Sequence, residues 1–277
     1  MELNWLQSLI MGLFSGLADV LPVSSQAHQA LLLTFFGGEA HPLTRFVIHL
    51  ATLLALLVVC WGQIARIRRQ LRLARLPKRI RNRTPDMASL MDARIIRTAC
   101  WPVVICLLLG RWIFGSGCSL VVVALASLLN AVLLYLPNLF ATADKDSRLV
   151  TPFEGLQMGL GAGAAVLPGI SSVGACYSVG ILHGVDRGYM IHLTMMIHMV
   201  YLAGQTVFDV LDAFALSAVT LDADTLLSLA LTGAAAAVGT VLGYRVMRKI
   251  ASASGLGRFS FYSFGLALLT FILYLMV

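Results

Sequence analysis

The most informative shortage in this sequence of 277 residues is charge, because Asp, Glu, Lys and Arg together make up only 12% of it. A soluble domain usually carries about 25% charged residues. Hydrophobic residues reach 59%, and several apolar runs approach the ~20 residues that cross a bilayer as a helix. The short alternating segments that mark a membrane β-barrel are missing from the sequence. The composition therefore excludes a soluble domain and predicts an all-α, polytopic membrane protein.

The sequence also lacks the cysteine and histidine spacings that build disulfide frameworks or zinc sites. Its five cysteines are scattered without a CxxC pair, and no HExxH stretch occurs. We therefore expect the cysteines, and likewise His49, His192 and His198, to be satisfied core residues. The N-terminal stretch carries Glu2 and no basic residue before its apolar run, which argues against a cleaved signal peptide.

The basic residues are concentrated in one segment. Eleven of the 20 Lys and Arg residues lie between positions 63 and 100, where Asp86 and Asp92 are the only acidic residues. No aromatic residues interleave with these charges, as they do on surfaces that bind single-stranded nucleic acid, so no nucleic-acid partner is expected. Loops rich in Lys and Arg stay on the cytoplasmic side, where they also meet anionic headgroups. Residues 62–97 are therefore predicted to form a basic cytoplasmic loop.

Ten apolar runs predict helices, and two pairs of them are interrupted by proline. One break lies at Pro22 and the other at Pro168-Gly169. Proline lacks an N–H and disfavours helix in the residue before it, so each pair is predicted to be a hairpin that enters and leaves the membrane on one side. The ten runs cover residues 3–19, 23–36, 43–61, 98–114, 118–138, 152–166, 170–183, 188–209, 225–247 and 258–276.

Counting each pair as a re-entrant hairpin leaves six transmembrane helices. With the basic loop inside, both termini and an Asp-rich loop fall outside, and a second basic loop falls inside, in agreement with the positive-inside rule. The halves 1–138 and 139–277 then each hold a hairpin and three spans in opposite orientation. We therefore expect one integral membrane domain over 1–277, an inverted repeat whose broken helices meet near the midplane, where such folds bind their ligands.

The stretch LPVSSQAH at 21–28 places polar groups at the first break, directly after Asp19. A carboxylate inside a membrane is costly and needs a partner, a proton or a metal. Ser24 and Ser25 begin a new helix, whose free N–H groups and dipole attract anions. His28 lies one turn further on, where it can donate to phosphate or carry protons. The alternative interpretation is helix capping by the serines beside a satisfied histidine.

The second break, LPGISSVG at 167–174, partly repeats the first. It offers Gly169, Ser171, Ser172 and Gly174 where another helix begins after a proline. Two helix N-termini that face one another would form a cradle for an anionic headgroup.

These motifs resemble those of a known family. SGLADVLPVSSQAHQ at 15–29 resembles the first motif of the bacterial undecaprenyl-diphosphate phosphatases, or bacitracin-resistance proteins, which reads approximately EGLTEFLPVSSTGH. MGLGAGAAVLPGISSVGACYSVGILHGVDR resembles the second, around PGxSRSGATxSxGLLxGxxR. The stretches RFVIHLATLLALLVVCW and GRFSFYSFGLALLTFILYL are also similar, so the resemblance covers most of the chain outside the basic segment.

The resemblance implies six spans, two re-entrant hairpins and hydrolysis of undecaprenyl diphosphate, the lipid carrier of cell-wall peptidoglycan synthesis, to the monophosphate. It implies Asp19, Ser25 and His28 as catalytic residues, with Asp19 also holding Mg²⁺ or another divalent cation. Either Ser25 or a metal-bound water would attack, and His28 would be the acid/base. The implied substrate-binding residues are Ser24, Gly169, Ser171, Ser172 and Gly174.

The sequence departs from the family pattern where charge is expected. Ser15 stands at the position of a glutamate and Ser172 at that of an arginine, while Val173 and Cys176 replace a serine and a threonine. Losing one electrostatic stabiliser commonly costs ~3–4 kcal/mol of barrier. The sequence therefore leaves three functions open: a phosphatase, an inactive homologue that binds or flips a phosphorylated lipid, or a structural or regulatory membrane partner.

The expected partners are the membrane and a polyprenyl phosphate or diphosphate lipid, with a homodimer as the candidate assembly. The expected location is the bacterial inner membrane, with the basic loop in the cytoplasm and both termini outside.

Overall fold

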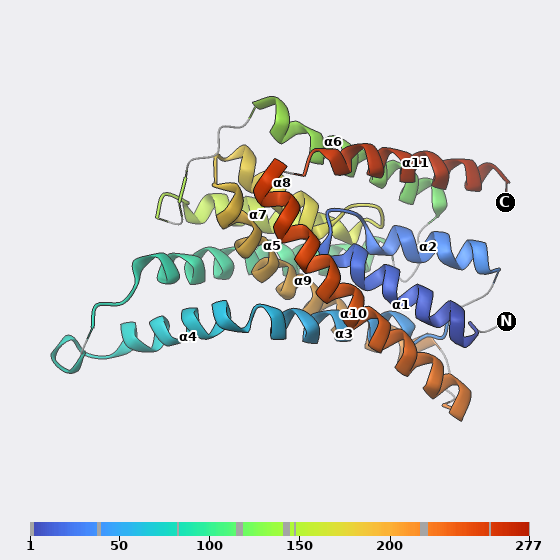
Figure 1. Ribbon diagram of the computed structural model, residues 1–277, viewed down its shortest axis with the longest axis horizontal. Helices are drawn as coiled ribbons and strands as arrows, with labels where there is room; N and C mark the ends of the chain where they lie inside the picture. The colour runs from blue at the N-terminus through green and yellow to red at the C-terminus, as the bar shows by residue number, and fades with distance from the viewer. Residues whose placement is uncertain are drawn as a thin grey trace.

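Helices make up the regular structure of this computed structural model, whose arrangement is drawn in Figure 1. The structure describes residues 3–37, 40–81, 83–114, 119–140, 145–146, 148–216, 221–254 and 256–276. Within these ranges there is no strand, so the predicted all-α class is confirmed. The helices are α1 (Trp5–Val20), α2 (Ser25–Phe36), α3 (Thr44–Val59), α4 (Trp61–Arg75), α5 (Met87–Phe114), α6 (Leu120–Phe140), α7 (Pro152–Gly163), α8 (Ser172–Leu182), α9 (Arg187–Leu216), α10 (Ala223–Ser254) and α11 (Arg258–Met276), with short 3-10 turns at Lys78–Ile80 and Ala164–Val166.

Several of these helices have the length and composition of membrane spans. Five are long and apolar enough to cross a bilayer, namely α5, α6, α9, α10 and α11. The pair α3 and α4, bent by 68° at their junction, counts as a sixth if it is one span. The protein is therefore a multi-pass membrane protein, and its described residues hold five such helices, or the predicted six if α3 and α4 form one span.

Helices α1 and α2 form one hairpin and helices α7 and α8 form another, and the two hairpins enter from opposite ends of the molecule. Figure 1 shows both termini at one end, together with the start of α1 and the end of α2, and the connection between α4 and α5 at the other end. At that other end, Glu154 in the first turn of α7 accepts from Lys145 Nζ at 2.8 Å and lies 3.9 Å from His183, directly after α8. The open end of the α7–α8 hairpin therefore lies at the opposite end of the molecule from the open end of the α1–α2 hairpin.

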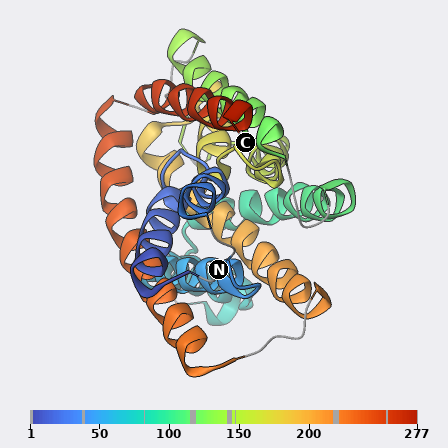
Figure 2. The ribbon, with the colours of Figure 1, turned by 90° about the vertical axis from the view of Figure 1, so that its right-hand side faces the viewer.

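Helix pairing follows the same inverted relation. Helix α1 packs along α10, and its counterpart α7 packs along α5, the counterpart of α10. Two further pairs, α3 with α9 and α6 with α11, each join corresponding helices of the two halves. Figure 2 shows α6 and α11 lying side by side. This exchange of partners is what a pseudo-two-fold axis in the membrane plane produces.

The basic segment is more ordered than the sequence indicates. Residues 61–75 form α4, and α5 already begins at Met87, so much of the predicted 62–97 loop is helical. Ile67 is buried and Ile64 packs against the main core, a helical spacing that the surrounding arginines obscure. Asp86 begins α5 by accepting from the Ser89 hydroxyl and from backbone amides, and these bonds hold the pKa of its carboxyl below the usual value.

Glycine lets the first hairpin approach α10 closely. The backbone carbonyls of Thr232 and Ala236 occupy the places where a Cβ on Gly12 or Gly16 would lie. Helices in membranes associate through such small-residue faces, because lipid tails leave little hydrophobic gain from pairing. The face of α1 that carries Gly12 and Gly16 is therefore a packing face, and Asp19 lies at its inner end.

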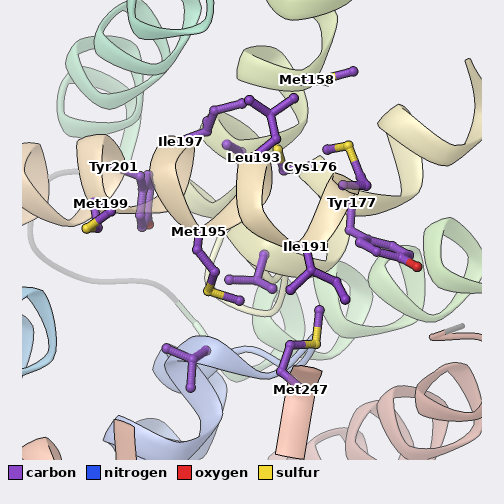
Figure 3. Close-up of a cluster of buried hydrophobic side chains, with 14 of the residues drawn as sticks. Met158, Cys176, Tyr177, Ile191, Leu193, Met195, Ile197, Met199, Tyr201 and Met247 are labelled. Atoms are coloured by element: carbon purple, nitrogen blue, oxygen red, sulfur yellow. The ribbon is translucent and has the colours of Figure 1, made fainter. Parts of the chain in front are cut away.

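The main hydrophobic core lies around α8 and α9, adjoining the hairpin tips. Figure 3 shows side chains from α7, α8, α9 and α10 filling it, among them Met158, Cys176, Met195 and Met247. Cys60 and Cys176 are buried free thiols, and Cys100 and Cys106 are half-buried, as expected of core residues. Cys118 lies outside the described residues. Tyr201 belongs both to this core and to the polar cavity described below, so the core fixes one wall of that cavity.

A substitution at Gly16 tests the α1–α10 contact. We expect Gly16→Ala to lower the free energy of unfolding by about 1–3 kcal/mol, because a backbone carbonyl cannot move aside as a flexible side chain would. Gly265→Ala on α11, where an added Cβ meets nothing within 4 Å, is the matched control and should be neutral or slightly stabilising. Thermal unfolding in detergent measures both; equal midpoints for the two variants would contradict the close contact.

Candidate functional site

The tips of the two hairpins are joined through their capping serines. Ser24 begins α2 by accepting from Ala27 N at 3.3 Å, and the same oxygen accepts from Gly169 N of the other hairpin at 3.0 Å. Gly169 has φ +126°, and a Cβ there would overlap α6, so glycine is required at this tip. The cap of one hairpin therefore satisfies the broken backbone of the other.

Ser171 makes the reciprocal connection. It begins α8 by accepting from Gly174 N at 3.1 Å and donates its own hydroxyl proton to the Leu21 carbonyl at 3.1 Å. The capping alternative is thus confirmed for Ser24 and not for Ser25, and Ser171 caps α8 in the same way. Each capping serine additionally fixes the position of the opposite tip.

Asn130 of α6 ties both tips to the surrounding helices. Its Oδ1 accepts from Ser171 N at 3.0 Å, and its Nδ2 donates to the Pro22 carbonyl at 3.3 Å and to Ser263 Oγ at 3.0 Å. The sequence predictions omit this residue, although a lone amide inside a long apolar helix is the available signal.

A small polar cavity of about 10 Å³, room for about one water molecule, lies against these tips. It brings together five of the predicted residues, and α2, α3 and α9 supply further wall. Its described lining is Asp19, Val23, Ser24, Ser25, Gln26, His49, Ala165, Ile170, Ser171, Ser172 and Tyr201.

Two buried polar atoms of the lining have no partner. Asp19 accepts from Ser25 Oγ at 2.9 Å through Oδ1, while its Oδ2 is buried without a hydrogen bond. Ser172 Oγ is likewise buried and unpaired. Buried polar groups are almost always satisfied, so these two atoms are available to a water molecule or a ligand in the cavity. Because α2 and α8 begin at Ser25 and Ser172, their N-terminal N–H groups and dipoles favour an anion there.

Other predicted residues lie outside the cavity lining. His28 is turned away: its Nδ1 lies 2.6 Å from the Ser24 carbonyl oxygen, its Nε2 lies 2.6 Å from Tyr262 Oη, and its ring stacks on Tyr262. Gly169 and Gly174 contribute backbone N–H groups to the capping serines. Both ring nitrogens of the predicted acid/base are therefore occupied.

The structure adds two lining side chains that the sequence assigned to the core or passed over. Tyr201 donates to the Ala165 carbonyl at 2.9 Å and accepts from Gln205 at 2.8 Å. His49 is paired with Asp209 of α9. The available signal for this pair was an ionisable residue inside each of two apolar helices.

The donor set of the cavity limits how a divalent cation can bind. Within the described residues, no three His, Cys, Asp or Glu side chains are grouped as metal ligands, and Asp19 is the one carboxylate in the described lining. Mg²⁺ commonly binds through one or two carboxylates and takes its other ligands from water and substrate phosphates. The unpaired Asp19 Oδ2 fits that mode, with a single protein ligand.

The fold and the site define a class: a multi-pass helical membrane protein with a small polar cavity where the tips of two helical hairpins meet. The chain matches the family model described as Bacitracin resistance protein BacA over residues 8–269, and it belongs to this family.

Curated relatives match this chain over most of its length. The chain is 29% identical over 209 residues to an undecaprenyl-diphosphatase of Bacteroides thetaiotaomicron, covering 75% of each protein. It is 31% identical over 189 residues to that of Micrococcus luteus (67% of this chain, 66% of the relative). It is 29% identical over 232 residues to that of Desulforapulum autotrophicum (80% and 82%).

Replacing Asn130 tests whether the tips depend on it. Asn130→Leu leaves Ser171 N and the Pro22 carbonyl buried without this partner, so we expect the free energy of unfolding to fall by about 2–5 kcal/mol. Ser127→Ala, one turn away on α6, removes a buried hydroxyl that has no hydrogen-bond partner and should have little effect. Thermal unfolding compares the two, and a similar small shift in both would show that Asn130 does not hold the tips.

Proposed function

We propose that this protein hydrolyses undecaprenyl diphosphate, or a similar polyprenyl diphosphate, to the monophosphate and inorganic phosphate. The observation that carries the proposal is the cavity between two helix N-termini, with Asp19 Oδ2 and Ser172 Oγ buried and unpaired on its wall. Membership of the BacA family and relatives named undecaprenyl-diphosphatase support the same reaction.

The helix N-termini provide the anion-binding part of this proposal. The terminal phosphate lies between the first turns of α2 and α8, where N–H groups and two hydroxyls can donate to its oxygens. Ser25 already donates to Asp19, so it orients the carboxylate, and water is the attacking group. The lipid chain remains among the apolar helices.

A divalent cation such as Mg²⁺, held by Asp19 Oδ2 and by the substrate phosphates, would neutralise part of the diphosphate charge. Position 15 supplies no second carboxylate, because serine stands there. Ser15 is also buried in α1 and does not belong to the described lining. At position 172 a neutral hydroxyl replaces the arginine of the family motif. We therefore expect slower hydrolysis than in relatives that keep both charges.

The orientation in the membrane follows from charge. We place the basic helix α4 and the start of α5 on the cytoplasmic side of a bacterial plasma membrane, and both termini outside. The α1–α2 hairpin, with Asp19 and Ser25 at its inner end, then opens to the outer side. This placement puts the released phosphate outside the cell.

Phosphate release by the purified protein tests the proposal. With undecaprenyl diphosphate and Mg²⁺, the wild type should release phosphate, and Asp19→Asn should reduce the rate by about two to three decades, because the amide still accepts from Ser25 but carries no charge. Asp222→Asn, at the exposed cap of α10, is the matched control and should keep the wild-type rate.

The same measurement separates catalysis from binding alone. If the wild type releases no phosphate while the lipid raises its unfolding temperature, the protein binds the lipid without cleaving it, and the proposed hydrolysis is wrong. If Asp19→Asn releases phosphate at the wild-type rate, the assignment of the site to this cavity is wrong.

A further inference from the structure

A buried acid–base pair has its histidine on the cavity wall and its carboxylate behind it, outside the described lining. His49 of α3 lines the cavity, and its Nδ1 lies 2.5 Å from Oδ2 of Asp209 on α9. The two residues are only 2% and 8% exposed. Ionisable side chains are costly inside membrane helices, where they face the protein interior and pair with one another. The cost of burying this pair beside a polar cavity therefore suggests that the pair has a function.

The Asp209 carboxylate determines which nitrogen of His49 can react. A carboxylate beside Nδ1 holds the proton on that nitrogen, so the neutral ring keeps Nε2 as an acceptor. His28 cannot serve in this arrangement, because both of its nitrogens are engaged outside the cavity. Among the described lining residues, His49 is the one imidazole.

We infer that His49 is the general base of the hydrolysis and that Asp209 is its positioning residue, an inference that rests on the proposed function. The oxygen of a water molecule attacks the terminal phosphorus, and one proton of that water passes to His49 Nε2. The bond from this phosphorus to the bridging oxygen breaks, and the bridging oxygen leaves on the lipid monophosphate. The other water hydrogen stays on the released phosphate, and His49 then gives its proton to solvent.

Charged or titratable groups on three helices surround this base. Asp209 and His198 act on it from α9, Asp19 from α1 and Arg45 from its own helix. Asp19 has no hydrogen bond to His49, because its Oδ1 accepts from Ser25 and its Oδ2 has no partner. The base and the carboxylate proposed to hold the cation are therefore separate groups on one cavity.

The test compares three variants over a range of pH. His49→Gln keeps an N–H donor toward Asp209 but cannot take up a proton, and Asp209→Asn would donate to Nδ1 and so place the proton on Nε2. For both we expect kcat to fall by about 100-fold or more with KM changed little, and the acid limb of the kcat profile to disappear from the residual activity. His192→Gln, near Arg66 and Arg248 and outside the cavity, should keep the wild-type rate and profile.

The rise in unfolding temperature that undecaprenyl diphosphate causes in each variant shows whether the site is still folded. Protected but inactive His49→Gln and Asp209→Asn proteins support the inference. Wild-type rates and an unchanged acid limb in either variant overturn it and leave the proposed hydrolysis intact. A wild type that is protected by the lipid but releases no phosphate overturns both.

Discussion

The site depends on one pair of reciprocal hydrogen bonds, from Gly169 N to Ser24 Oγ and from Ser171 Oγ to the Leu21 carbonyl. A chain that turns back inside a membrane leaves backbone groups without partners, and in hydrocarbon each such group costs several kcal/mol. Here each hairpin supplies the partner that the other lacks. The two tips are therefore stable only together, and the cavity exists where they meet.

The opposed arrangement of the two hairpins is the basis for the anion site that we propose at this meeting point. Two hairpins that enter from opposite sides bring two helix N-termini, those of α2 and α8, to the same depth. In the proposed mechanism, their partial positive charges do part of what the arginine does in the family pattern. They do not replace the second acidic residue, so the remaining chemistry is assigned to Asp19 and to the His49–Asp209 pair on neighbouring helices.

The parts of the fold that local chemistry determines were predictable from the sequence. Pro22 and Pro168 identified both hairpins, and the serine pairs that follow them identified both new helix starts, because proline geometry and capping act over a few residues. Helix α4 was missed, since its arginines hide the apolar spacing that Ile64 and Ile67 provide.

Contacts between distant segments were not predictable. His28 leaves the cavity because Tyr262, 234 residues later, binds its ring, and His49 enters the cavity wall through a partner 160 residues away. A single sequence gives no information on such pairings.

The most direct measurement is an experimental structure of the protein with a non-hydrolysable polyprenyl diphosphate analogue bound. The account predicts the terminal phosphate between the first turns of α2 and α8, within about 3 Å of the Ser25 and Ser172 hydroxyls. A headgroup bound elsewhere would contradict it, for instance in the second small cavity that Tyr177, Ser178 and Arg187 line.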